Sequence, residues 1–301
     1  MKKIVRLLSF FALVPVFLFA AEGPLFGTLE GQVLAAGKKL LLIDSAGETL
    51  WEYKAGNCAD VWMLDNGHVL FANGSVTEVD PKTDKIVFTY TPEMTVEGGT
   101  YSCQRLANGN TVVGENSAGR ITEVDSSGKV IFKLDLPMTT PEHHQNLRMV
   151  RKLDNGNYLV CHSGKAIVRE YTPAGEVKFE IKVPGNIAFS AVRLPNGNTM
   201  TGHINGITEY SPDGTVVWSF KKSDLPDLAL GMICGIHIQP NGNIAMGIYR
   251  IATEGKSAEF LEITREKKLA WRYKAENSPS ARMGVHVLTR DGESCEKNPL
   301  R

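Results

Sequence analysis

A short phrase built around an Asn-Gly or Asp-Gly pair recurs six times in this chain and constrains the fold more than any other feature. The turn glycines are Gly67, Gly109, Gly156, Gly197, Gly242 and Gly292, at spacings of 42, 47, 41, 45 and 50 residues. Such pairs between alternating apolar runs favour β-hairpins, because both central residues of a type I′ turn need a positive φ. A repeat of this length made of hairpins is typical of propeller blades.

A second phrase accompanies each turn: a short apolar strand, another turn, and a strand that carries an aromatic residue. The aromatic residues are Trp51, Phe88, Phe132, Phe179, Trp218 and Trp271. A glutamate recurs in the same phrase, at Glu78, Glu123, Glu170, Glu209 and Glu262. Because nearly every unit carries them, we expect scaffold roles. The aromatic rings should pack between blades, and the glutamates should accept hydrogen bonds from a neighbouring loop.

Each unit therefore predicts four short antiparallel strands, and the chain as a whole predicts an all-β, six-bladed β-propeller. The segment 40–53 supplies later strands of a blade without a clear first strand, whereas 284–292 supplies a first strand alone. We therefore expect strands from the N- and C-terminal parts of the chain to share one blade, an arrangement that removes free sheet edges. A first strand at 25–29, which would make a seventh blade, is the alternative.

The start of the chain resembles a secretory signal peptide. Lys2, Lys3 and Arg6 precede an uncharged run from Leu7 to Ala21 that ends in small residues, so we expect cleavage after Ala20 or Ala21. A membrane anchor is the alternative, but the run is short for a span of about 20 residues and contains a proline. The predicted organisation is a signal peptide at 1–21, one propeller domain at 22–293 and a C-terminal tail at 294–301. The mature protein is expected to be exported, periplasmic or secreted, without a membrane span, and monomeric.

Composition narrows the possible partners. The chain has 33 Lys and Arg against 33 Asp and Glu, a balance that argues against nucleic-acid binding through a broad positive field. Its five cysteines show no CxxC spacing, so no zinc or redox motif is predicted, and three of them fall inside strand patterns as small buried side chains.

Two phrases carry a family resemblance. The segments Asp80 to Phe88 (DPKTDKIVF) and Asp44 to Trp51 (DSAGETLW) resemble the repeat of quinoprotein (PQQ-type) propellers. The combination of Asn-Gly-Asn turns with E-V-D phrases is similar to the repeat of arylsulfotransferase-like six-bladed propellers. The resemblance implies the propeller fold and suggests either a quinone cofactor or group transfer through a histidine nucleophile on an inner strand.

The functional residues of those families do not carry over. Quinoprotein dehydrogenases are longer, have eight blades and carry an adjacent cysteine pair, which this chain lacks. The arylsulfotransferase histidine lies shortly before the turn. Here the positions eight residues before the turn glycines are Ala59, Tyr101, Arg148, Phe189, Cys234 and Gly284, and none is histidine.

Histidines are predicted to gather at one end of the propeller. We call the end with the loops between blades the connection face, and the end with the Asn-Gly turns the turn face. His162 and His203 should lie at equivalent positions on the connection face, with Glu115 in the same slot of another blade. His143 and His144 fall in a loop on this face. The arginines that could add anion-binding groups are Arg148, Arg105 and Arg282.

His237 and His286 stand in the parallel phrases GIHI and GVHV on neighbouring inner strands. Alternation along a strand could direct them either to the channel or between sheets. No pair of residues has a spacing that predicts a metal site, because the adjacent side chains of His143 and His144 would diverge on a strand.

Two classes of function follow. The first is an exported binding protein that holds a small molecule, a glycan or a protein partner at the channel, with His143, His144, Arg148, His162, His203 and Glu115 as candidate binding residues. The alternative is an arylsulfotransferase-like group-transfer enzyme or a hydrolase, with His237 and His286 as catalytic candidates. A quinone-binding oxidoreductase is a third possibility, and the sequence identifies no cofactor.

Overall fold

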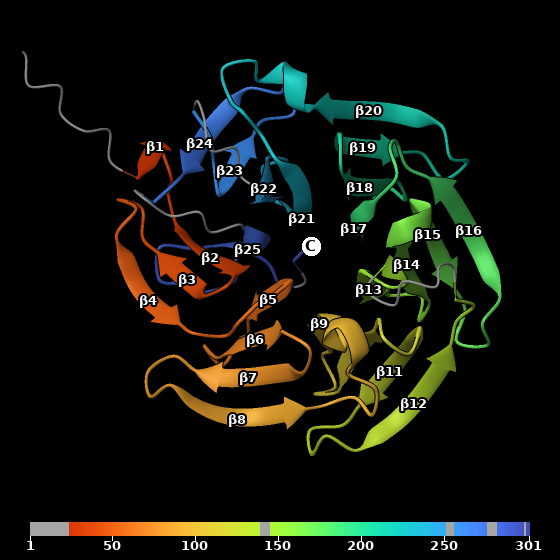
Figure 1. The fold of residues 1–301 in the computed structure, drawn as a ribbon. Helices are drawn as coiled ribbons and strands as arrows, with labels where there is room; N and C mark the ends of the chain where they lie inside the picture. The colour runs from red at the N-terminus through yellow and green to blue at the C-terminus, as the bar shows by residue number, and fades with distance from the viewer. Residues whose placement is uncertain (1–23, 139–144, 251–255, 276–281, 298) are drawn as a thin grey trace, which may run out of the picture.

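The computed structural model describes residues 24–138, 145–250, 256–275, 282–297 and 299–301. Within these ranges 25 strands form six antiparallel sheets arranged as a ring around a central channel (Figure 1). The predicted six-bladed β-propeller is therefore confirmed. The predicted signal peptide lies outside the described residues. None of the helices in the described part of the chain is long and apolar enough to span a membrane.

The blades are numbered I to VI, with strands given from the channel outward. Blade I contains β25 (Arg282–Leu288), β2 (Gln32–Gly37), β3 (Leu40–Ile43) and β4 (Thr49–Tyr53). Blade II contains β5 (Asp60–Met63), β6 (Val69–Ala72), β7 (Val76–Asp80) and β8 (Lys85–Tyr90). Blade III contains β9 (Thr100–Arg105), β10 (Thr111–Glu115), β11 (Arg120–Val124) and β12 (Val130–Asp135).

Blade IV contains β13 (Met149–Lys152), β14 (Tyr158–His162), β15 (Ile167–Tyr171) and β16 (Val177–Lys182). Blade V contains β17 (Ala188–Arg193), β18 (Thr199–His203), β19 (Gly206–Tyr210) and β20 (Val216–Lys221). Blade VI contains β21 (Met232–Ile238), β22 (Ile244–Tyr249), β23 (Phe260–Ile263), β24 (Leu269–Tyr273) and β1 (Leu25–Gly27). Short 3-10 turns lie at η1 (Val96–Gly98), η3 (Ser163–Lys165) and η4 (Lys222–Asp224).

Strands from both ends of the sequence close the ring. In blade I, β25 pairs with β2 in a register that sets Leu288 opposite Gln32, so the predicted shared blade is confirmed. The segment considered as a possible first strand of a seventh blade instead forms β1, which pairs with β24 as a fifth, outermost strand of blade VI. The two closures lie in neighbouring blades, so each end of the described chain is held by a sheet.

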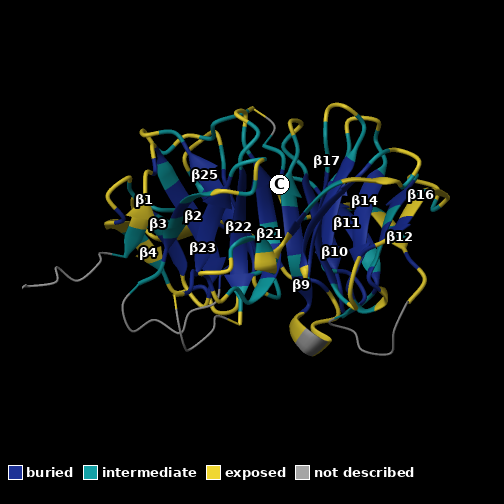
Figure 2. Ribbon diagram, turned by 90° about the horizontal axis from the view of Figure 1, so that it is seen from above, coloured by how far each residue is buried: buried dark blue, intermediate teal, exposed yellow. Residues whose placement is uncertain are grey.

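The hydrophobic core lies between the blades, where apolar faces of neighbouring sheets meet, and the inner strands are almost entirely buried (Figure 2). The recurring glutamates and aromatic residues join these layers at the turn face. Arg105 of blade III donates to Glu78 of blade II at 2.7 Å, and its guanidinium lies over the Phe88 ring. Likewise, Arg193 of blade V donates to Glu170 of blade IV, and its guanidinium lies over the Phe179 ring. The predicted role of the glutamates as hydrogen-bond acceptors is confirmed. In blade VI, however, Glu262 accepts from Gln239, Asn243 and Trp271 of its own blade, not from a cation of the next blade.

Candidate functional site

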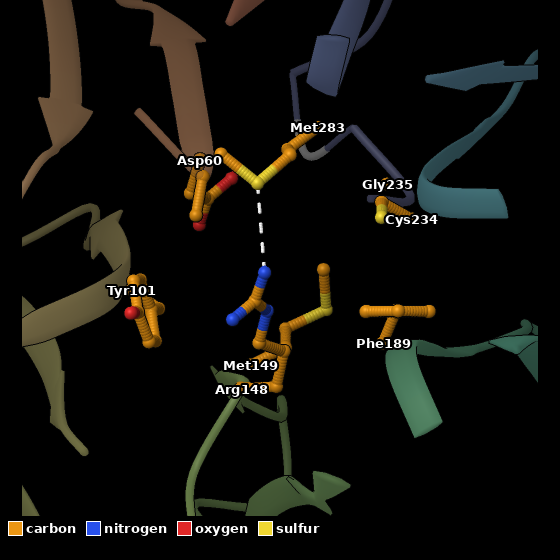
Figure 3. A pocket seen from close by; sticks show the side chains of 9 residues that line it. Asp60, Tyr101, Arg148, Met149, Phe189, Cys234, Gly235 and Met283 are labelled. Atoms are coloured by element: carbon orange, nitrogen blue, oxygen red, sulfur yellow. Dashed lines mark hydrogen bonds between the residues drawn. The ribbon is translucent and has the colours of Figure 1, made fainter. Parts of the chain in front are cut away.

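The connection-face mouth of the channel is a small hollow to which all six inner strands contribute. It comprises about 260 Å³ of space between atoms, part of it open to solvent. The lining residues are Ala59, Asp60, Tyr101, Arg148, Met149, Phe189, Cys234, Gly235 and Met283 (Figure 3). Five of them occupy the slot eight residues before a turn glycine. The slot that lacks the arylsulfotransferase histidine is therefore the one that faces the channel mouth.

Glycine shapes the blade I and blade VI sides of this mouth. A Cβ on Gly235 would come within 2.5 Å of the Met283 carbonyl oxygen, so a side chain there would force β21 and β25 apart. A Cβ on Gly284 would lie 3.2 Å from the Ala59 carbonyl oxygen. The three inner strands can therefore approach closely, and the side chain that blade I contributes to the hollow is Met283.

Arg148 is the cation of this hollow. Its guanidinium carbon lies 4.3 Å from the centroid of the Tyr101 ring and 5.6 Å from that of Phe189, and one terminal nitrogen is 3.5 Å from the Met283 sulfur. Figure 3 shows the guanidinium near the centre of the hollow, between the two rings. Within the described ranges no carboxylate lies at ion-pair distance from it. Aromatic faces and a thioether hold the group in place, and no carboxylate of the described residues compensates its positive charge.

A buried ion pair forms the floor of the hollow. Arg151 donates to both carboxylate oxygens of Asp60, at 2.8 and 3.0 Å, and both side chains are about 95% buried. Asp60 also accepts the backbone N–H of Cys103. Because this carboxylate is already fully engaged, it does not neutralise Arg148. Among the described residues, the hollow therefore carries the positive charge of Arg148 without a carboxylate paired to it.

His237 and His286 lie deeper in the channel, with ring centroids 5.2 Å apart. Nδ1 of His286 accepts the backbone N–H of Met63 in blade II at 3.1 Å. Nδ1 of His237 accepts the backbone N–H of Val287 in blade I, also at 3.1 Å. With Nδ1 used as an acceptor, each neutral imidazole carries its proton on Nε2. The two rings thus join neighbouring inner strands.

Similar bridges cross the other four seams between inner strands. Asp60 joins β5 to β9, Ser102 joins β9 to β13, Met149 joins β13 to β17, and Ser190 joins β17 to β21. Each bridge links a side chain of one strand to the backbone of the next. Both histidines are fully buried, and this burial lowers their pKa values below the usual range. At neutral pH they are uncharged members of this ring of bridges.

The other predicted binding residues lie apart from the hollow. His162, His203 and Glu115 end equivalent strands on the connection face, as predicted. His162 pairs with the Tyr171 hydroxyl at 2.8 Å, and His203 pairs with the Thr208 hydroxyl at 2.9 Å. Burial lowers the pKa of each of these histidines to about 4. His203 also borders a surface groove on blade V with about 920 Å³ of space between atoms, part of it open to solvent.

Glu115 accepts a hydrogen bond from the Tyr90 hydroxyl of blade II at 2.7 Å. Of the other arginines named from the sequence, Arg105 pairs with Glu78 at the turn face, and Arg282 pairs with the buried Glu259 at 2.9 Å. His143 and His144 lie outside the described residues. Arg148 is thus the one predicted binding residue that the described structure places in the channel mouth.

Sequence reasoning did not select several residues of the hollow as candidates, among them Tyr101, Phe189, Met149 and Met283. The sequence did contain a signal that could have identified this slot: the position eight residues before the turn glycine holds a different residue in each blade. Cys234 also lies there, and burial raises the pKa of its thiol to about 12, so it is protonated at neutral pH. All five cysteines are free. Within the described ranges no three His, Cys, Asp or Glu side chains converge to hold a metal ion.

No protein-family model and no curated protein matches the sequence. Among solved structures, a Bacteroides caccae protein of unknown function superposes with a TM-score of 0.74 at 21% identity, covering 85% of this chain and 98% of that one. A streptogramin B lyase superposes with a TM-score of 0.59 at 14% identity, covering 91% of both chains. The WD40 propeller domain of Doa1 reaches 0.58 at 11% identity, covering 89% of this chain and 95% of that domain. At these identities the likeness shows the propeller fold.

Proposed function

We propose that this protein binds a small organic anion at the connection-face mouth of its channel, with Arg148 as the charged contact. The observation that carries the proposal is a guanidinium between two aromatic rings with no carboxylate beside it among the described residues. An arginine fork binds a carboxylate or sulfate through two parallel hydrogen bonds. The rings of Tyr101 and Phe189 and the sulfur of Met283 would contact an apolar part of the same ligand.

The size of the hollow limits what can enter. The centre of a water-sized group can occupy only about 20 Å³ of it, which is room for roughly one such group, so only the anionic head would sit beside Arg148. The rest of the ligand would project toward the connection face. A carboxylate or a sulfate ester on an aromatic or aliphatic body meets both requirements, whereas a bulky folded partner would reach Arg148 only through a protruding acidic side chain.

Calorimetric titration tests this proposal with benzoate and phenyl sulfate against the neutral benzamide. We expect the two anions to bind, benzamide to bind more weakly, and affinity to fall as salt is added. Arg148→Gln should weaken anion binding about tenfold or more, the effect of losing a charged hydrogen bond. Arg105→Gln is the matched control, because that arginine is paired at the turn face. Equal anion affinity in Arg148→Gln and wild-type protein would refute the proposal.

Group transfer through His237 or His286 is the alternative, and it has less support because both rings are fully buried and each Nδ1 accepts a backbone N–H of a neighbouring inner strand. An assay with an aryl sulfate donor and a phenol acceptor tests it on the same preparations. Turnover that is lost in His237→Gln and His286→Gln, with melting temperatures unchanged, would support catalysis. Absence of turnover in the wild-type protein would exclude this sulfuryl transfer.

The proposal includes export to the periplasm or the medium, based on the charged start and apolar run of residues 1–21. N-terminal sequencing of the protein from its producing cells should give a first residue of Ala21 or Glu22. A membrane-bound protein that retains Met1 would contradict it. Sedimentation of the same material should give a monomer.

A further inference from the structure

The tail after β25 turns back and enters the channel from the turn face. Its described residues bridge Ser294 to Leu288 and Leu300 to Ile238, with the Ile238 N–H donating to the Leu300 carbonyl at 2.9 Å. The C label in Figure 1 marks the end of this path inside the ring. The tail thus meets the inner strands of blades VI and I as a short extended segment.

Arg301 lies in a pocket made by three inner strands. Its guanidinium carbon is 4.5 Å from the centroid of the Trp62 ring, and its Nε donates to the Val285 carbonyl at 3.0 Å. A terminal nitrogen stands 4.0 Å from Asp60, and Arg151 donates to the Arg301 carbonyl at 2.8 Å. The pocket therefore contacts both parts of an arginine. The Trp62 ring, the Val285 carbonyl and the Asp60 carboxylate surround its side chain, and Arg151 donates to its backbone.

The docked tail leaves several buried polar atoms unsatisfied. Nη1 of Arg301, Oε1 of Glu296 and Nε2 of His237 are buried without a hydrogen-bond partner among the described residues, although the last two stand 3.4 Å apart. Asp60 is mainly engaged by Arg151, and burial lowers the pKa of Arg301 to about 9. Each unsatisfied polar atom weakens docking relative to the surrounding sheets. Because the tail belongs to none of the six sheets, its displacement would leave the strand pairing of the blades intact.

We propose that the turn-face end of the channel is a binding site for an extended peptide that carries an arginine side chain, and that Leu300 and Arg301 fill this site within the same chain. The pocket favours arginine over lysine because a planar guanidinium can lie on Trp62 while it donates sideways to the Val285 carbonyl and stands 4.0 Å from the Asp60 carboxylate. The site is separate from the anion site, since the Asp60–Arg151 pair lies between them. A partner with an exposed arginine in an extended segment would compete with the tail.

A peptide titration tests the site on full-length protein. The probe is a fluorescent synthetic peptide with the sequence of residues 294–301, serine replacing cysteine, and the control probe carries citrulline in place of arginine. The Arg301→Ala protein, whose pocket is vacant, should bind the arginine probe at least about tenfold more tightly than the wild type, in which the tail competes. The citrulline probe should lose most of this binding, because it lacks the charge.

A second variant guards against a folding defect in Arg301→Ala. Leu300→Gly removes the side chain that packs against the core of blades V and VI and makes the tail more flexible, but it keeps the arginine, so it should also bind the probe more tightly than the wild type. Thermal melts identify which variants are folded. Equal probe affinity in a folded variant and the wild type, or equal affinity for the arginine and citrulline probes, would overturn the proposal. Benzoate affinity is measured in parallel, because it reports on the anion site independently.

Discussion

The turn-face glutamates and the residues around the channel mouth occupy equivalent places in successive blades, yet only one of the two sets is repeated. Five blades carry the same glutamate, and in blades II to V it pairs with a cation of the next blade. At the mouth the blades supply alanine, tyrosine, arginine, phenylalanine, cysteine and methionine. A repeated residue meets a need that every blade shares, whereas a position that differs in each blade is free to build one asymmetric site.

The largest expected loss of stability is at Asp60, a residue that is not repeated from blade to blade but supports the channel. Asp60→Ala should lower the free energy of unfolding by about 3–5 kcal/mol, because it leaves the buried Arg151 without its carboxylate. Urea unfolding measures the change, with Asp44→Ala in an exposed turn as the control. A loss below about 1 kcal/mol would show that water compensates Arg151.

The buried histidines at the blade ends give the next largest effect, through pH. Burial lowers the pKa of His162 from its ordinary value of 6.5 to about 4 in the folded protein, so the unfolded state binds more protons between these values. The contribution of this histidine to stability should therefore be complete above pH 6.5 and fall by about 3 kcal/mol as the pH drops from 6.5 through 4. Urea titrations across this range should show a smaller fall in His162→Gln. An unchanged pH dependence would remove His162 as the cause.

A repeated glutamate should affect stability and spare binding. Glu170 accepts hydrogen bonds from Asn155, Asn157 and Arg193, so Glu170→Gln should cost about 1–2 kcal/mol. Glu180→Gln is the matched control on the same blade, since its pair with Arg169 is half exposed and should contribute less than about 1 kcal/mol. Benzoate affinity should be the same in both variants. A binding defect in Glu170→Gln would contradict the separation between the turn-face glutamates, which stabilise the fold, and the channel-mouth residues, which bind the ligand.

The smallest expected change in stability is at Arg148. Because its guanidinium has aromatic and thioether neighbours but no ion pair within the described ranges, Arg148→Gln should change the free energy of unfolding by less than about 1 kcal/mol. A larger loss in urea unfolding would assign Arg148 to the scaffold. The expected pattern, lost binding with retained stability, is the reverse of that expected for Glu170→Gln.

The sequence repeat was sufficient to predict the blades, their closure and the scaffold glutamates, because period-2 alternation and turn chemistry act locally. Counting back from the turn glycines also located the slot of Arg148. At blade I the slot holds Gly284, and a register shift beside it in the pairing of β2 with β25 accompanies the use of Met283 instead. The histidine bridges depend on backbone N–H groups of other blades, which alternation cannot identify. The docking of the tail depends on Trp62, Asp60 and Val285, and nothing periodic in residues 294–301 indicates it.

The pairing of β2 with β25 also sets the time at which the ring can close during synthesis. Gln32 pairs with Leu288, so the inner strand of blade I is made 256 residues after the strand it covers. At about 5–20 residues per second, the gap lasts roughly 10 to 50 seconds. During it the apolar β2 strand has an unpaired edge, which is a template for association with another chain. Any insertion between the two strands, in whichever blade, lengthens this period of exposure.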